Sequence, residues 1–324
     1  MRIVYAGSPG IAVPALETLA ALEQEGVHEL VGILTNPDSP RARHGSAEPT
    51  EVSVAGTLLS EIRKARGMPP LAQFKPERLS AEVRAQLTAL APDLLVSFAY
   101  GRIFDPLFLQ VFPRGGINIH PSLLPRYRGP SPIQAAILAG DKETGISIQT
   151  LAPEMDAGDL LVQERFSLHG QETTGELSAL IAQKAAALLP DLLGRLAQGT
   201  FTARPQAHDQ ASFCSLIRKE DGRIDWSWSA PSIAARIRAF TPWPLSWTLH
   251  GEQYLYILEG KPFAATNRTA VPGTVLGIDK QGGILIQTGE GVLGLTQLQY
   301  RTKKALAWRD FINGARDFIG SCLG

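Results

Sequence analysis

Short apolar runs closed by turn residues constrain the fold of this chain more than any other feature. Residues 2–6 (RIVYA) lead into Gly-Ser-Pro-Gly and then a helix-like stretch at 13–22. Residues 29–34 (ELVGIL) end in Thr-Asn-Pro-Asp, and residues 93–98 (DLLVSF) are almost entirely apolar. A strand that is apolar on both faces is typical of a parallel sheet covered by helices. Repeated strand, tight turn and helix therefore predict an α/β domain.

The first two hundred residues continue this alternation. Further elements are expected as helices at 54–66, 81–91, 131–138 and 173–196, and as strands at 117–120, 145–150 and 160–166. Periodicity is then lost in a segment rich in Pro, Gln, Ala and Ser, which predicts a linker. We therefore expect a first domain at 1–199, a linker at 200–217 and a second domain at 218–324.

The second domain differs in pattern and in charge. A helix at about 231–240 precedes short alternating runs that glycines interrupt, at 253–258, 273–278, 283–287 and 291–298. This spacing predicts a small antiparallel barrel. The whole chain has 31 basic and 31 acidic residues, but residues 206–324 have 13 Lys and Arg against 10 Asp and Glu. The excess favours a C-terminal part that meets an anion.

The stretch 115–129 (GGINIHPSLLPRYRG) is the candidate site. Alternation along the expected strand places Asn118 and His120 on the same face. A histidine at a strand end is by itself most simply a hydrated side chain. However, Asp156 lies in an acidic loop between two later strands, and ligands of open α/β sheets bind beyond the carboxyl ends of strands. We therefore expect Asp156 to lie over the strand that bears Asn118 and His120.

Motifs of other enzyme classes are missing or out of place. Residues 289–294 match G-x-G-x-x-G, but they lie between two strand-like runs, which disfavours a nucleotide site. The chain has neither a P-loop nor a G-x-S-x-G elbow. Its histidines form no H-x-x-x-H pair, and Cys214 and Cys322 have no zinc spacing, so we expect no metal. We find no apolar segment of membrane-spanning length and no secretion signal, and we expect a cytoplasmic protein without a membrane partner.

Three candidate groups remain, namely an amide at Asn118, an imidazole at His120 and a carboxylate at Asp156. They supply an oxyanion donor, a proton-transfer group and a group that orients it. Without a nucleophile or a metal, this set suits the transfer of an acyl group to an amine that the substrate brings. Such a reaction requires a carrier that delivers the acyl group.

The run N-x-H-P-S-L-L-P at 118–125, with M-D-x-G around Asp156, resembles the folate-dependent formyltransferase family, which uses 10-formyltetrahydrofolate. Segments such as AGSPGIAVPALETL, FAYGRI, KEDGRIDWS and IRAFTPWPLSW extend the resemblance over nearly the whole chain and are most similar to the branch that acts on methionyl initiator tRNA. The resemblance implies a Rossmann-like N-terminal domain, an OB-like C-terminal barrel, and catalysis by Asn118, His120 and Asp156.

The resemblance also implies two binding regions. The folate cosubstrate is expected at Phe98, Tyr100, Gly101, Arg102, Ile103, Ser122, Leu123, Leu124 and Pro125. The tRNA is expected at the basic residues Arg41, Arg43, Arg301, Lys303 and Lys304. Here the chain departs from the family pattern, because the loop at 37–44 (PDSPRARH) lacks the usual lysines.

Two other functions stay open. A formyltransferase acting on an amino-sugar nucleotide shares the H-P-S-L-L-P core, although the opening AGSPGIAVP and the barrel-like tail favour tRNA. A folate- or RNA-binding module without catalysis is disfavoured by the intact trio. We therefore predict a monomeric enzyme that transfers the formyl group of 10-formyltetrahydrofolate to the free amino group of methionyl initiator tRNA.

Overall fold

The computed structural model describes residues 1–40, 46–264, 270–315 and 317–324. Their contacts form two compact units. Unit 1 consists of Met1–Pro132, Glu143–Phe166 and Ser178–Cys214, and unit 2 consists of Ile133–Lys142, Ser167–Leu177 and Ser215–Gly324. Two short pieces of the first domain expected from the sequence (1–199) therefore belong to the same unit as the C-terminal part.

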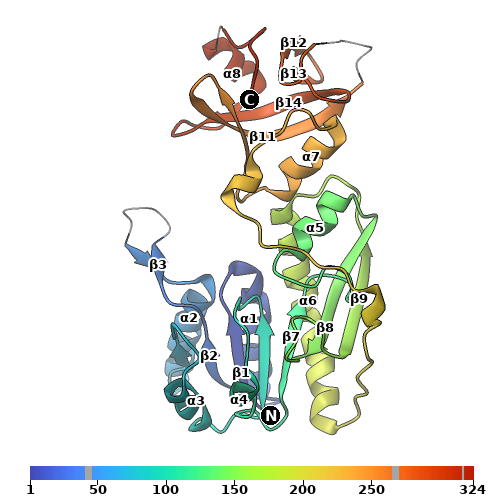
Figure 1. Ribbon diagram of the computed structural model, residues 1–324. Helices are drawn as coiled ribbons and strands as arrows, with labels where there is room; N and C mark the ends of the chain where they lie inside the picture. The colour runs from blue at the N-terminus through green and yellow to red at the C-terminus, as the bar shows by residue number, and fades with distance from the viewer. Residues whose placement is uncertain (41–45, 265–269, 316) are drawn as a thin grey trace. The chain divides into compact units, whose positions relative to one another are not determined.

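Unit 1 is built on a seven-stranded sheet with the order β5-β2-β1-β6-β7-β8-β9 (Figure 1). The strands are β1 (Arg2–Gly7), β2 (Glu29–Leu34), β5 (Ala72–Phe74), β6 (Leu94–Phe98), β7 (Gly116–His120), β8 (Glu143–Thr150) and β9 (Leu160–Ser167). Strands β5, β2, β1, β6 and β7 are parallel, whereas β8 is antiparallel to β7. The predicted α/β class is confirmed, and an antiparallel strand is added beside the strand of the candidate site.

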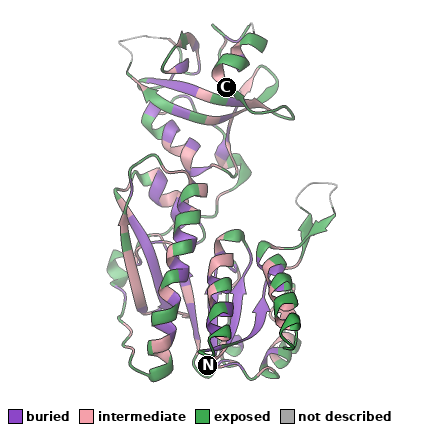
Figure 2. Cartoon of the chain, turned by 180° about the vertical axis from the view of Figure 1, so that it is seen from behind, coloured by how far each residue is buried: buried purple, intermediate pink, exposed green. Residues whose placement is uncertain are grey.

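Helices accompany this sheet. They are η1 (Gly10–Ala12), α1 (Val13–Gln24), α2 (Glu51–Ala65), α3 (Ala81–Thr88), α4 (Pro106–Leu109) and α6 (Thr174–Gln198), and a short ribbon is formed by β3 (Ser39–Pro40) and β4 (Ala47–Glu48). Helix α5 (Pro132–Ala139) belongs, apart from its first residue, to unit 2. Val4 of β1 belongs to one buried cluster with Leu87 of α3 and Phe108 of α4. Tyr5, the next residue of β1, points to the opposite face, where its hydroxyl donates to the carbonyl of Ala12. Strand β1 is therefore covered on both faces, and Figure 2 shows the central strands of the sheet as buried.

Helix α6 is an exception to the expectation that the chain has no apolar segment of membrane-spanning length. Within the described residues, it is the helix that is long and apolar enough, by length and composition, to cross a membrane. Its buried residues recur at helical spacing, as in the core helix of a globular protein: Leu177, Ile181, Ala185, Leu189 and Leu192. The helix begins with a capping box, in which Glu176 accepts from the backbone of Thr173 at 2.9 Å.

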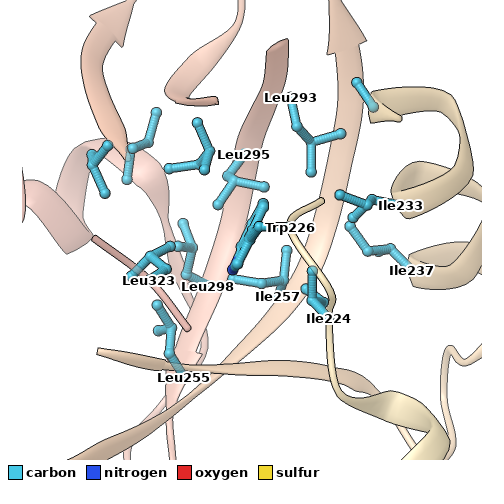
Figure 3. Packing of buried hydrophobic residues seen from close by; sticks show 14 of the residues in the cluster. Ile224, Trp226, Ile233, Ile237, Leu255, Ile257, Leu293, Leu295, Leu298 and Leu323 are labelled. Carbon is cyan, nitrogen blue, oxygen red and sulfur yellow. The ribbon is translucent and has the colours of Figure 1, made fainter. Parts of the chain in front are cut away.

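Unit 2 contains an antiparallel sheet with the order β10-β11-β14-β13-β12, and β15 pairs with β14. The short helix η2 (His208–Gln210) still belongs to unit 1. The later elements of unit 2 are η3 (Lys219–Gly222), α7 (Ala230–Ala239), β10 (Ser246–His250), β11 (Gln253–Phe263), β12 (Val275–Asp279), β13 (Gly283–Gln287), β14 (Val292–Tyr300), β15 (Leu306–Ala307) and α8 (Trp308–Gly314). Ile233 and Ile237 of α7 pack with Leu293 and Leu295 of β14 in a core around Trp226 (Figure 3). This architecture is consistent with the predicted OB-like domain.

Candidate active site

Strand β7 presents the first two groups of the candidate site. Asn118 and His120 are two residues apart and therefore lie on the same face of the strand. Asn118 pairs with Ser97 of β6 on one side and with Gln149 of β8 on the other. Because directly opposite residues of neighbouring strands share a face, β8 supplies a second amide beside Asn118.

The loop between β8 and β9 brings Asp156 back over β7. The loop is closed onto the end of β8, because the amide of Thr150 donates to the carbonyl of Asp159 at 2.9 Å and the Thr150 hydroxyl accepts from the Asp159 amide at 2.9 Å. Gly158 lies so close to Thr150 that a Cβ atom there would overlap the Thr150 carbonyl. Asp156 itself has a φ of 52°, the left-handed conformation that aspartate tolerates better than most residues. The sequence M-D-x-G therefore fits the shape of this turn.

The Asp156 carboxylate is the centre of the site. Its Oδ2 accepts from the amide of Gly129 at 2.8 Å, and its Oδ1 accepts from Nε2 of Gln149 at 3.1 Å. The two contacts to the strand β7 residues are longer, at 3.5 Å from Nδ2 of Asn118 and 3.4 Å from Nδ1 of His120. The shorter contacts hold the carboxylate independently of Asn118 and His120.

The tautomer of His120 follows from its other nitrogen. Nε2 lies 2.8 Å from the carbonyl of Tyr127, which only accepts, so Nε2 carries a hydrogen. Burial lowers the pKa of His120 below its ordinary value, although Asp156 and the Tyr127 carbonyl act in the opposite direction. A neutral ring protonated at Nε2 has a lone pair on Nδ1. That lone pair faces the Asp156 carboxylate, and together they form a place where an added proton is stabilised.

The residues predicted to bind folate differ in exposure, and Arg102, Leu123 and Pro125 are half-buried. Gly101 and Ile103 are exposed, and Ile103 has an exposed fraction of 70%. Phe98, Tyr100, Ser122 and Leu124 are buried, so the side chains of Phe98 and Leu124 belong to the core.

Several of these residues also have structural partners. Nε of Arg102 donates to Oδ1 of Asn36 at 2.7 Å, and the Ser122 hydroxyl donates to the Arg126 carbonyl at 2.6 Å. Tyr100 stacks on Phe104, and burial raises the pKa of Tyr100 to about 12, so its hydroxyl stays protonated near neutral pH. Leu123 and Pro125 are half-buried beside these core residues.

The residues predicted to bind tRNA lie apart from this site in sequence. Arg41 and Arg43 are outside the described residues. Arg301, Lys303 and Lys304 are exposed in the turn between β14 and β15. Arg301 lies over the ring of Tyr254 at 5.2 Å and Lys303 over the ring of Tyr300 at 5.4 Å, so two of the three cations rest on aromatic faces.

Sequence reasoning missed three groups that contact the trio, namely the side chain of Gln149, the amide of Gly129 and the carbonyl of Tyr127. A signal existed for Gln149, because strand β8 (ETGISIQT) places this polar side chain among buried apolar ones. The two backbone groups have no sequence signal beyond Gly129 itself. Its φ is 116°, and a Cβ atom there would overlap the Cys214 carbonyl.

Comparison with known families and proteins gives matches over both parts of the chain. The family model described as "Formyl transferase" matches residues 1–193, and "Formyl transferase, C-terminal domain" matches residues 216–316. The protein named methionyl-tRNA formyltransferase in Treponema denticola is 45% identical, with 98% of each chain covered. That of Treponema pallidum (strain Nichols) is 44% identical and covers 100% of this chain and 99% of its own. That of Chloroflexus aggregans is 40% identical, with 97% of each chain covered.

Solved structures with low identity share the fold. HypX from Aquifex aeolicus in complex with tetrahydrofolic acid has a TM-score of 0.64 at 15% identity, covering 98% of this chain and 48% of its own. WlaRD, described as a sugar 3N-formyl transferase and solved with dTDP and 5-N-formyl-THF, has a TM-score of 0.62 at 15% identity, covering 94% of this chain and 99% of its own.

Proposed function

The chain belongs to the methionyl-tRNA formyltransferase family. We propose how its residues carry out folate-dependent formyl transfer. The reaction formylates the free amino group of methionyl initiator tRNA, and 10-formyltetrahydrofolate is the donor. The proposal rests on one observation, namely that Nδ2 of Asn118 and Nδ1 of His120 both face Oδ1 of Asp156.

The amine of the methionyl ester attacks the formyl carbon of the donor. As the carbon becomes tetrahedral, its oxygen takes on negative charge, and the Asn118 amide donates a hydrogen bond to it. This requires Nδ2 of Asn118 to turn from Asp156, which it contacts at only 3.5 Å. The structure holds Asp156 by Gln149 and Gly129 independently of Asn118, so this movement leaves the carboxylate in place.

Once the amine nitrogen has bonded to the formyl carbon it carries a surplus proton, which goes to the His120 and Asp156 pair. Nδ1 of His120 has the lone pair that receives it, and the carboxylate 3.4 Å away stabilises the resulting imidazolium. The imidazolium also opposes the charge on the oxyanion. Collapse of the tetrahedral intermediate breaks the bond between the formyl carbon and the donor nitrogen, which takes the proton from the His120 imidazolium and leaves as tetrahydrofolate. The product is N-formylmethionyl-tRNA.

We assign the folate to the carboxyl ends of β6 and β7. Phe98 at the end of β6 is in register with Ile119 of β7, so the backbone after Phe98 lies beside the Asn118 and His120 strand. The buried Phe98 and Leu124 make this region apolar, and Gly101 to Ile103 expose backbone there. An apolar lining with a few polar groups is typical of cofactor pockets. Binding is therefore assigned to unit 1.

We assign the tRNA to unit 2 and to the loop at 37–44, with the enzyme acting as a cytoplasmic monomer. The observation in favour is the exposed cationic turn at Arg301, Lys303 and Lys304. A basic and aromatic surface on an OB-like domain suits a nucleic-acid backbone. The test of the whole proposal is to supply a donor with a labelled formyl group and methionyl initiator tRNA. We expect label in the aminoacyl ester, and a wild-type protein that transfers none would refute the proposal.

A further inference from the structure

Gln206 is a buried residue of the segment that follows α6, and its side chain contacts Gln149 and the loop that carries Asp156. Its exposed fraction is 5%, although its neighbours at 204–205 and 207–210 are exposed. Its Nε2 lies within hydrogen-bonding distance of the Asp156 carbonyl at 2.9 Å, the Gly158 carbonyl at 2.6 Å and Oε1 of Gln149 at 3.1 Å. One side chain therefore contacts both the loop that carries Asp156 and the amide that donates to its carboxylate.

The other end of Gln206 is fixed by a buried arginine. Arg128 has an exposed fraction of 4%, and its Nη2 and Nε donate to Oε1 of Gln206 at 2.8 and 3.2 Å. Nη2 also lies 3.0 Å from Nδ1 of His208. The arginine belongs to the same loop as Gly129, whose amide donates to Asp156. The contacts therefore close a ring that joins three segments far apart in the sequence.

This ring has a fixed direction of donation. A guanidinium only donates, so Gln206 must turn its oxygen to Arg128 and its nitrogen to Gln149. Gln149 must then turn its oxygen to Gln206 and its nitrogen to Oδ1 of Asp156, 3.1 Å away. Without the first two members, Gln149 could rotate its amide and present an oxygen to the carboxylate. Two acceptors facing each other repel, and the carboxylate would move away from its place beside His120.

We infer that Gln206 is a positioning residue for formyl transfer, which with Arg128 sets the orientation of the Gln149 amide and thereby the place of the Asp156 carboxylate. The inference rests on the proposed function, since it acts through Asp156. It gives the segment after α6 a role in catalysis. Backbone hydrogen bonds also join this segment to the loop that carries Arg128. The Arg128 amide donates to the Ser212 carbonyl at 2.8 Å, and the Cys214 amide donates to the Arg128 carbonyl at 2.8 Å.

The experiment compares two variants of the full-length protein with a matched control. Gln206→Leu removes all contacts of the amide at similar volume, and Gln206→Glu keeps an acceptor for Arg128 but no donor for Gln149 or the loop carbonyls. Gln210→Leu is the control, because Gln210 is exposed in the same segment. Each protein is assayed for kcat and KM with methionyl initiator tRNA and the formyl donor between pH 5.5 and 8.5, a range of about three units around the ordinary histidine pKa. Thermal melting reports folding.

We expect both Gln206 variants to lose kcat by on the order of 10²-fold with KM for either substrate changed little, because misplacing a catalytic group costs about that much. The acid side of their kcat profile should move to lower pH, because a displaced Asp156 carboxylate no longer raises the pKa of His120, the proposed proton acceptor. The double variant Gln206→Leu with Arg128→Met should lose no more kcat than either single variant, because both residues act through one chain of hydrogen-bond donors.

If Gln206→Glu folds and matches Gln210→Leu in kcat and in pH profile, the inference is wrong. The same conclusion holds if the loss lies in KM alone. Should Gln206→Leu fail to melt cooperatively, the Gln206→Glu protein decides the question. Failure of the proposed function would look different, because wild-type protein itself would then formylate no methionyl-tRNA.

Discussion

Gln149 lies directly opposite Asn118 in the antiparallel pair of β7 and β8, and both amides face the same oxygen of Asp156. This pairing explains why the site is held by one amide while the other is available to substrate. Gln149 is the nearer, at 3.1 Å, and is itself anchored by Gln206. Asn118 is the farther, at 3.5 Å, and is the one assigned to the oxyanion.

Removing the proposed proton acceptor should abolish most of the activity. We expect His120→Ala and Asp156→Asn each to lower kcat by about 10²- to 10⁴-fold, the range found for general acid-base groups and oxyanion donors. Glu154→Gln is the control, since Glu154 is an exposed acid of the same loop. Near wild-type kcat in either of the first two variants would remove that residue from the mechanism.

The lowered pKa of His120 predicts how stability depends on pH. Burial disfavours the charged ring in the folded state, so below the ordinary pKa of about 6.5 the unfolded chain binds a proton that the folded chain does not. This contribution to stability is complete above that value and is lost as pH falls toward the lowered pKa.

The measurement is the difference in the unfolding free energy between wild type and His120→Gln, taken at several pH values from 8 to 5, a span of roughly three units around that pKa. We expect the wild type to lose more stability than the variant as the pH is lowered. A difference that stays constant over this range would contradict the prediction.

Gly158 should tolerate no side chain, because a Cβ atom there would overlap the carbonyl of Thr150. Gly158→Ala must push the Asp156 loop away from β8, which we expect to lower kcat and to reduce stability by about 1–3 kcal/mol, as for other strained substitutions. Gly194→Ala is the control, since Gly194 lies in α6 with open space around its Cβ position and should gain up to about 1 kcal/mol. Equal melting temperatures for the two variants would show that the loop is free to shift.

Much of the fold could be predicted because its elements are local in sequence. The expected strand at 29–34 is the observed β2, and the helix expected at 231–240 is α7 within a residue. Strand β10 and helix α8 were not predicted, since neither has a clean period in the sequence. Spacing and strand alternation also predicted that Asp156 would lie near Asn118 and His120.

What the sequence could not reveal is the support around the candidate site. The segment at 200–217 was expected to be a linker because its periodicity is lost, yet Gln206 within it is buried and bonded to the Asp156 loop. Such a contact joins residues 50 positions apart through one polar side chain. No repeat or alternation in the chain signals it, and only the folded backbone brings the partners together.

The cationic turn after β14 should govern tRNA binding rather than chemistry. We expect Arg301→Ala, Lys303→Ala and Lys304→Ala together to weaken binding of methionyl initiator tRNA, and to lower the slope of log affinity against log salt by about one unit per lost phosphate contact. The rate at saturating tRNA should change little. Lys280→Ala, an exposed lysine in the β12–β13 turn, is the control. An unchanged salt slope in the triple variant would remove the turn from the tRNA interface.

Methionyl initiator tRNA is the proposed formyl acceptor, and a competition assay distinguishes it from an amino-sugar nucleotide. The wild-type protein is given 10-formyltetrahydrofolate together with methionyl initiator tRNA and a 4-amino sugar nucleotide, and both possible products are quantified. We predict N-formylmethionyl-tRNA as the product, with formylation that disappears in Asp156→Asn. Formylation of the sugar nucleotide alone would show that methionyl initiator tRNA is not the formyl acceptor.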